Sequence, residues 1–316
     1  MLKGTVKKAV LSVVRMQSSL LHGLMKIFAL LLSCAAVLCI IFTSHVQAGT
    51  ELTDSQYFLT SKIPPRPSGA MTGSEFARFV SGMDTSHRER AVVEQLLKGN
   101  IPDFLRKLSP LQFHLGFKNG KSVTATIFAM PDYLAIGSDL DFLLVPMNLY
   151  SAVRVALEFG FVLPTKKIVD AIFRESAVHY TPEPMTPGPQ MSSTGYYVKH
   201  NREICDQRLS LGYQLGALVS GHKKDVVISN RLVRNVGKIA IYGWHRLSGV
   251  PIQPLSTVHD AGYEDYSHGI RLVSNTILID NEKKSIYDVL QDPKLASLLS
   301  DEGAINGIHQ FLSTCR

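Results

Sequence analysis

A proline-rich stretch near the middle of the chain constrains the fold more than any other sequence feature. Residues 181–191 read TPEPMTPGPQM and contain four prolines. Proline cannot donate a backbone hydrogen bond and disrupts helices and central strands, so this segment must be an irregular crossing loop. Because it is too short to separate two independent domains, we expect a single domain over residues 70–316.

The sequence before this loop predicts mainly helices, and the sequence after it predicts mainly strands. A helix over about 145–159 should end at Gly160, and the next helix should begin after Thr165. Apolar and β-branched residues predict strands in three later segments, 224–229, 238–245 and 269–274. We therefore expect the α+β class, with a helix-rich N-terminal half packed on a mainly antiparallel sheet in the C-terminal half.

The N-terminal sequence has the features of an export signal. A lysine precedes an apolar run over 27–42, and Val46 and Ala48 suit cleavage before Gly49. The run is about sixteen residues long, whereas a membrane-spanning helix needs roughly 20. We expect an exported protein, periplasmic or secreted, that meets the membrane only through an uncleaved leader. The predicted divisions are an upstream extension (1–24), a signal peptide (25–48), a proline-rich linker or arm (49–69) and a single α+β domain (70–316).

The net charge gives no reason to expect a nucleic-acid partner. The whole chain carries a formal charge of +7, but residues 1–48 hold five basic residues and no acidic residue. The remaining chain therefore has 28 Lys+Arg against 26 Asp+Glu, a net charge of +2. A nearly neutral protein lacks the basic surface that a phosphate backbone requires.

The cysteines that remain after the leader leave two alternatives open. Cys205 and Cys315 could pair, because an exported protein reaches a compartment that permits disulfides. Such a bridge would tie the C-terminal tail to the middle of the fold. The alternative is a pair of buried, unpaired thiols.

Histidines concentrate in the C-terminal half, where HDAGYEDYSHGIRLV (259–273) combines them with acids, tyrosines and an arginine. Polar residues on a loop that leads into a strand are typical of catalytic sites. Strand alternation places His268 and Arg271 on opposite faces, so both can serve one site only if the strand begins irregularly. We predict catalytic roles for four residues and substrate binding by four more: His245, His259, His268 and Asp265, then Lys224, Arg271, Tyr263 and Trp244.

A zinc site is one form that this prediction can take. Catalytic zinc uses three protein ligands and a water molecule, and His245, His259 and His268 are the candidates. The spacing from His259 to Asp265 resembles the pattern of zinc D-Ala-D-Ala peptidases, which implies metal-dependent peptide hydrolysis. The aspartate here comes one residue early, and the tryptophan-histidine strand precedes the motif instead of following it. The alternative is a site without a cofactor.

The metal-free alternative has a resemblance of its own. SHGIRLV (267–273) resembles the SHGCIRL signature of L,D-transpeptidases, which crosslink peptidoglycan, but isoleucine follows the glycine directly and the cysteine is absent. The resemblance implies a related β fold without cysteine acyl transfer. Ser267 is then a candidate nucleophile, polarised by His259 or His268, with Arg271 as an anion clamp.

A broader resemblance covers most of the chain after the leader. GHKKDVV, IYGWH and DYSHGIRLV look like a family of exported bacterial proteins with no established activity, which implies export and a single domain. We predict an exported hydrolase-like enzyme that acts on a cell-envelope or extracellular polymer, a peptide or a glycan, with one imidazole as general base. The alternative is a non-catalytic binding protein for a sugar or peptide.

Overall fold

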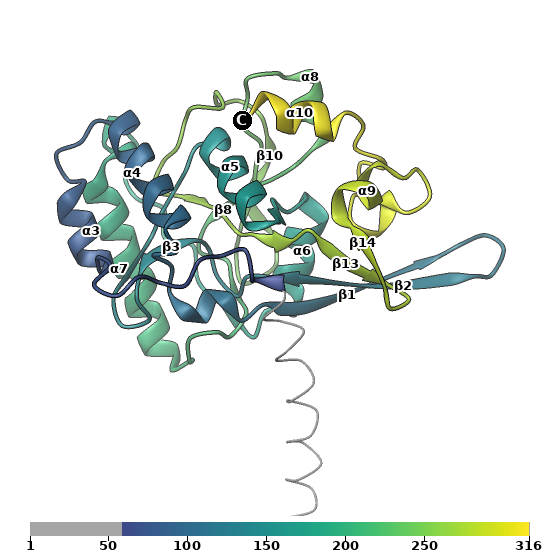
Figure 1. Cartoon of the computed structure of the whole chain (residues 1–316), viewed down its shortest axis with the longest axis horizontal. Coiled ribbons are helices and arrows are strands. Elements are labelled where there is room, and N and C mark those ends of the chain that lie inside the picture. Colours follow the sequence, from purple (N-terminus) through teal and green to yellow (C-terminus); the bar gives the residue numbers. More distant parts are fainter. Residues whose placement is uncertain (1–58, 316) are drawn as a thin grey trace, which may run out of the picture. The chain divides into compact units, whose positions relative to one another are not determined.

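Two β-sheets organise residues 59–315, the part of the chain that the computed structural model describes (Figure 1). The larger sheet has six strands in the order β14-β13-β2-β12-β5, with β1 also paired to β2, and its pairings are antiparallel. The predicted upstream extension, the signal peptide and residues 49–58 of the predicted arm lie outside the described residues. The strands are β1 (Ser109–Gly116), β2 (Ser122–Ala129), β5 (Phe161–Val162), β12 (Val273–Ser274), β13 (Thr276–Ile279) and β14 (Glu282–Ser285).

The smaller sheet carries four of the predicted site residues, Lys224, Trp244, His245 and His268. Its order is β10-β9-β8-β11, with β8 and β11 parallel and the other pairs antiparallel. Its strands are β8 (Lys224–Val226), β9 (Ile241–His245), β10 (Pro251–Ser256) and β11 (His268–Gly269). Two short pairs complete the strands, β3 (Ala135–Gly137) with β4 (Phe142–Leu144) and β6 (Val178–His179) with β7 (Val219–Ser220).

Most helices begin at a side chain that caps their first turn. Asn148 caps α5, Thr165 caps α6 and Ser193 caps α7, each by accepting a hydrogen bond from a backbone N–H. Gly160 ends α5 in the left-handed conformation, as its position predicts. The helices are α3 (Gly73–Phe79), α4 (Thr85–Leu97), α5 (Leu149–Phe159), α6 (Lys166–Glu175), α7 (Thr194–Leu211), α8 (Asn230–Arg234), α9 (Ile286–Gln291) and α10 (Ile308–Thr314), with 3₁₀ turns at Asp103–Arg106, Pro189–Ser192 and Ala296–Leu298.

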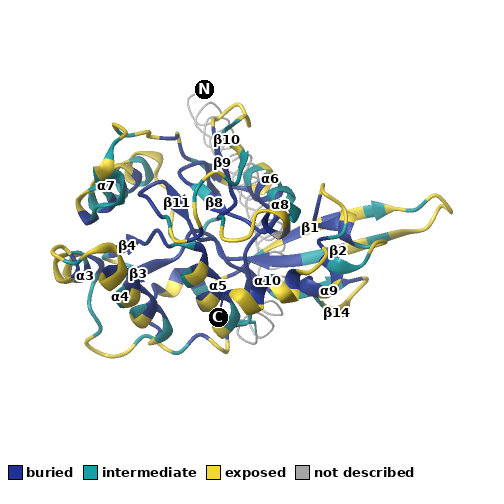
Figure 2. Cartoon of the chain, turned by 90° about the horizontal axis from the view of Figure 1, so that it is seen from above, coloured by how far each residue is buried: buried dark blue, intermediate teal, exposed yellow. Residues whose placement is uncertain are grey.

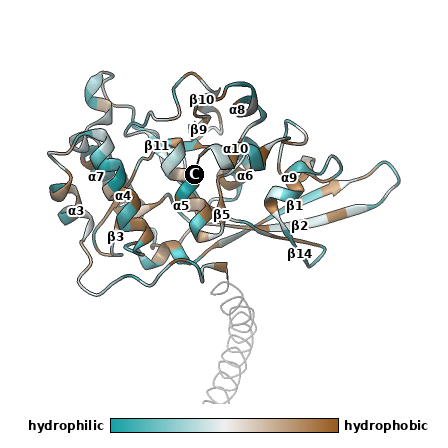
Figure 3. Ribbon diagram, turned by 45° about the horizontal axis from the view of Figure 1, so that its top comes forward, coloured by the Kyte–Doolittle hydropathy of each residue, from teal (hydrophilic) through white to brown (hydrophobic). Residues whose placement is uncertain are grey.

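The helices bury one face against the sheets. Figure 3 shows both hydrophilic and hydrophobic residues on α4 and α5, as expected for helices with one face in the core. Figure 2 shows buried strands in the interior and an exposed tip on the β1–β2 hairpin. One large apolar core joins the helices to both sheets, and a separate aromatic cluster consists of Tyr197, Trp244 and Tyr266. No helix among residues 59–315 is long and apolar enough to cross a membrane.

The α+β class is confirmed, with helices mostly in the N-terminal part and strands mostly in the C-terminal part. The third predicted strand, 269–274, is divided between two sheets. His268 and Gly269 pair with β8, whereas Val273 pairs with β2 and β5. The residues between them bond to the loop before β3, because Leu272 O accepts from Met130 N and Ile270 O from Leu134 N. Cys205 and Cys315 are free thiols in this structure.

Candidate functional site

The parallel pairing of β8 and β11 builds the centre of the candidate site. It sets His268 opposite Lys224, and Lys224 N donates to Ser267 O at 2.8 Å. Gly269 allows the close approach, because an added Cβ would lie 2.5 Å from the Tyr133 ring and 2.9 Å from Lys223 Cβ. The two segments that the sequence separates by about forty residues therefore meet side by side.

A turn formed by residues 265–268 fixes the acid next to the histidine. Asp265 Oδ1 accepts hydrogen bonds from Ser267 N (2.7 Å) and Ser267 Oγ (2.5 Å), and Oδ2 accepts from Tyr263 Oη at 3.0 Å. Burial raises the pKa of Asp265, but His268, the Ser267 bonds and Lys224 outweigh it and lower the pKa below its usual value. Asp265 is therefore an anion, and Ser267 donates its hydroxyl proton to this anion and not to a histidine.

His268 is completely buried, and neither of its ring nitrogens has a hydrogen-bond partner. Burial lowers its pKa to about 4, and the charges of Lys224, His259 and Lys223 act in the same direction against the favourable Asp265. At neutral pH the ring is uncharged, with one N–H donor and one nitrogen acceptor. A buried polar group without a partner is rare in folded proteins and calls for a ligand, a water molecule or a catalytic role.

Lys223 and His200 are buried residues of the same cluster as His268. Lys223 Nζ donates to Tyr266 O at 2.6 Å and lies 3.4 Å from His200 Nδ1. Burial lowers the pKa of Lys223 to about 7, although Asp265 and Asp132 oppose the shift. His200 Nε2 has no partner, so a second imidazole in the cluster is incompletely bonded.

Trp244 has a strained backbone conformation and lies beside Lys224 and His200. Its φ is 54°, in the left-handed region that a bulky side chain rarely adopts, and such strain costs on the order of 1–3 kcal/mol. Lys224 Nζ lies 5.1 Å from the centroid of the Trp244 ring, and the indole Nε1 has no hydrogen-bond partner. The tryptophan packs with Tyr197 and Tyr266.

The proline-rich loop covers this aromatic cluster. Met185 N donates to Tyr266 Oη at 2.7 Å, Tyr266 N donates to Met191 O at 3.0 Å, and both methionine side chains pack on the cluster. At the other end of the loop, Ser192 Oγ donates to Glu264 O. The predicted crossing loop therefore packs directly against the candidate site.

His259 and Tyr263 connect the buried centre with the surface. Both are half-buried, and their rings stack with centroids 4.3 Å apart and an angle of 16°. The Tyr263 ring in turn meets His268 edge to face at 5.7 Å. The structure therefore brings together six predicted residues, which are Lys224, Trp244, His259, Tyr263, Asp265 and His268.

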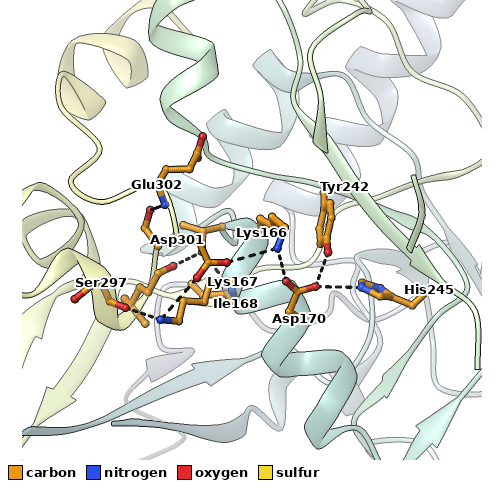
Figure 4. A network of polar contacts seen from close by, with 12 residues as sticks. Lys166, Lys167, Ile168, Asp170, Tyr242, His245, Ser297, Asp301 and Glu302 are labelled. Atoms are coloured by element: carbon orange, nitrogen blue, oxygen red, sulfur yellow. Dashed lines mark hydrogen bonds and ion pairs between the residues drawn. The ribbon is translucent and has the colours of Figure 1, made fainter. Parts of the chain in front are cut away.

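His245 and Arg271 do not join this group. His245 Nε2 instead contacts Asp170 Oδ1 on α6 at 3.1 Å (Figure 4). The His245 ring stacks on Phe173.

Arg271 has a structural environment. It is completely buried, Nη1 donates to Met130 O at 3.0 Å, Nη2 donates to Val219 O at 2.8 Å, and the guanidinium lies over Tyr133. A guanidinium held by buried carbonyls is not free to bind an anion from solvent. The expected anion clamp therefore has no geometric support here.

The zinc prediction gains no support from the geometry. Among residues 59–315, no three His, Cys, Asp or Glu side chains are arranged to hold a metal ion. With His245 turned toward α6, the three predicted histidine ligands do not converge. Three surface pockets among residues 59–315 are lined by other residues, and the cluster meets the surface at Lys224, His259 and Tyr263, which are half-buried.

Three members of the cluster carry no predicted role: His200, Lys223 and Tyr266. His200 lies in α7 on the face that also buries Tyr197 and Ile204, and a histidine at such spacing is the only local signal. Lys223 and Lys224 are adjacent, and the structure buries the first completely and the second partly.

Comparisons with family models, with curated proteins and with solved structures found no match to this chain.

Proposed function

We propose that this protein is an exported hydrolase that cleaves a cell-envelope or extracellular polymer, with His268 as the general base. The observation that carries the proposal is the state of His268, which is fully buried and neutral, has two unused ring nitrogens and lies beside an anionic aspartate. Most buried histidines with a structural role have at least one hydrogen-bond partner, whereas His268 has none among the described residues.

The proposed step is the hydrolysis of an amide or ester bond. The free nitrogen of His268 takes a proton from water, whose oxygen attacks the carbonyl carbon, and the imidazolium then returns the proton to the leaving group. Asp265 stabilises the imidazolium by its charge, and Tyr263 and Ser267 hold the carboxylate in place. No cofactor takes part in this scheme.

The substrate class follows from the predicted export signal and the local L,D-transpeptidase resemblance. Both make peptidoglycan the first polymer to test. The full chain should be purified and incubated with isolated peptidoglycan, and the soluble fragments should be measured by chromatography. We expect fragment release by the wild type.

The matched variants are His268→Leu and His245→Leu, because both remove a buried histidine of the smaller sheet. His268→Leu should lower fragment release by about a hundredfold or more, in the range that general-base catalysis contributes. His245→Leu should retain activity. Equal activity of His268→Leu and the wild type, with folding confirmed by circular dichroism, would reject the proposal.

A non-catalytic binding protein for a sugar or peptide is the second candidate function. The strained Trp244, with its unused N–H and its aromatic neighbours, favours it, because aromatic rings with a free polar edge are typical of ligand sites. Binding of peptidoglycan fragments without any release of products would favour this function over the hydrolase.

A further inference from the structure

The groups around Trp244 offer hydrogen-bond donors that are not paired with an acceptor among residues 59–315. Trp244 Nε1 can only donate, lies on a side chain that is 4% exposed, and has no partner. A protonated Lys223 can only donate, so its 3.4 Å contact with His200 Nδ1 makes Nδ1 the acceptor and leaves the ring proton on the partnerless Nε2. Lys224 Nζ makes no hydrogen bond to a described residue and lies over the indole.

The acid that acts on Lys224 is hydrogen-bonded to other groups. Asp265 attracts Lys224 through its charge, and the hydrogen bonds that its oxygens accept come from Ser267 and Tyr263. The acid can therefore attract Lys224 through its charge without filling the donors of Trp244 and His200. Three donors therefore remain unpaired among the described residues: the Lys224 ammonium, the indole N–H of Trp244 and the Nε2–H of His200.

The backbone gives an independent indication of a ligand site. Trp244 keeps a φ of 54° and follows Gly243 at 110°, and strained positions of this kind cluster at ligand clamps and active sites. The strain sets the indole beside Lys224 and His200, because the Trp244 and His200 rings meet edge to face at 6.4 Å.

We propose that Lys224, Trp244 and His200 bind a carboxylate of the substrate. This inference rests on the proposed function and specifies its substrate class, a polymer unit that carries a free carboxylate close to the bond that is cleaved. A carboxylate accepts several hydrogen bonds at once and gains most from a cationic donor. Lys224 is the half-buried member and is the first of the three that a carboxylate from solvent can meet, whereas His200 and Trp244 are buried.

Carboxylate binding would also raise the pKa of His268, the proposed general base. The positive charge of Lys224 opposes protonation of His268. A bound carboxylate neutralises that charge and makes the imidazole a better proton acceptor. Substrates with a carboxylate are therefore expected to be both better bound and more readily cleaved.

The chain contains a single tryptophan, Trp244, so its fluorescence reports on this position alone. The full protein should be titrated with two matched pairs of probes: N-acetyl-Ala-Ala as free acid and as C-terminal amide, and N-acetylmuramic acid with N-acetylglucosamine. We expect a saturable fluorescence change with at least one acid and about tenfold weaker binding of its neutral counterpart, the size of one charge-assisted hydrogen bond. The pair that discriminates identifies a peptide or a sugar as the source of the carboxylate.

The variants Lys224→Met and Lys224→Arg test the cation itself, with the exposed Lys294→Met as control. Lys224→Met should weaken binding of the acid by about tenfold and leave the neutral probe unchanged, while Lys224→Arg restores part of the affinity and Lys294→Met has no effect. The inference is overturned if no probe gives a saturable change, if acids and neutral probes bind alike, or if Lys224→Met binds the acid normally.

The two proposals fail separately. His268→Leu should lose fragment release while it keeps the preference for the acid, because His268 is not part of the carboxylate position. Acid-selective binding without any hydrolysis by the wild type would leave the carboxylate site standing and remove the hydrolase. Hydrolysis without acid-selective binding would support the hydrolase and reject the carboxylate site.

Discussion

Two polar clusters of the smaller sheet contain a buried histidine, and they differ in how their atoms are bonded. Asp170 accepts from Lys166 Nζ (2.7 Å) and Tyr242 Oη (2.6 Å) and pairs with His245 Nε2 (Figure 4). The cluster around His268 has unused atoms on three side chains, Trp244, His200 and His268 itself. Satisfied polar networks stabilise a fold, whereas unsatisfied ones cost free energy and persist where function requires them.

The largest expected effect falls on the satisfied cluster. Asp170→Ala leaves Lys166, Tyr242 and His245 without their shared acceptor and should lower the free energy of unfolding by about 2–4 kcal/mol. Urea denaturation followed by tryptophan fluorescence measures the change. Asp260→Ala, which removes an exposed ion pair with Lys238, is the control and should leave the midpoint unchanged. A loss no larger than the control would contradict the assigned role of Asp170.

The two histidine variants compare the clusters directly. His245→Leu breaks a bond to a carboxylate and should cost about 1–2 kcal/mol of stability. His268→Leu removes a polar ring with no partners and should leave the free energy of unfolding unchanged or raise it by about 1 kcal/mol. Thermal denaturation of both variants gives the comparison. If His268→Leu is the more destabilised of the two, His268 has a structural role and the contrast between the clusters is wrong.

The clusters should also respond to pH at opposite ends of the scale. Burial lowers the pKa of Lys223 from its ordinary 10.5 to about 7, so the folded protein binds fewer protons than the unfolded chain between these values. This group therefore makes the free energy of unfolding rise with pH from about 7 to 10.5. Lys223→Met should remove that rise in denaturation curves recorded across the window, and Lys294→Met should keep it. An unchanged slope in Lys223→Met would show that Lys223 is not buried as described.

At the acidic end, Asp170 is the group that titrates. Burial raises its pKa, but the bonds from His245, Lys166 and Tyr242 outweigh it and lower the pKa from 3.8 to about 2. The stabilisation is present above pH 3.8 and is lost as the pH falls toward 2. Asp170→Asn should be less stable than the wild type at neutral pH, and the difference should shrink in this acid range.

The smallest expected effect belongs to Tyr263. Its hydroxyl donates to Asp265, and Tyr263→Phe should lower stability by about 1 kcal/mol or less because the site is half-buried. Since the carboxylate would then be less firmly held, fragment release should fall severalfold. Unchanged activity in Tyr263→Phe would separate this bond from the proposed catalysis.

Local signals predicted the fold class and several helices well. Gly160 and Thr165 mark the end of α5 and the start of α6 because glycine and threonine act on their own neighbouring backbone. The strand predicted over 269–274 was wrong as a single element. Its two ends pair with different sheets, and only distant partners decide that division.

The difference between local and long-range contacts also explains which site residues could be predicted. Residues 259–268 could be recognised because their polar groups are adjacent in sequence, and the structure keeps them together. His245 could not be separated from His268 by type or pattern, since both lie at strand ends and only Asp170, on a helix far away in sequence, marks the first as structural. His200 and Lys223 enter the cluster through contacts between α7 and the smaller sheet, which no local pattern reports.

The pairing of β11 with β8 has a consequence for the order of events during folding. The partner strand of Lys224 begins only at His268, and the helix that supplies His200 comes much earlier, so the cluster depends on contacts of high sequence separation. Such contacts form late, because the intervening chain must first be ordered. A polypeptide that is still being synthesised, or is truncated before residue 260, therefore lacks β11 and carries an unassembled cluster.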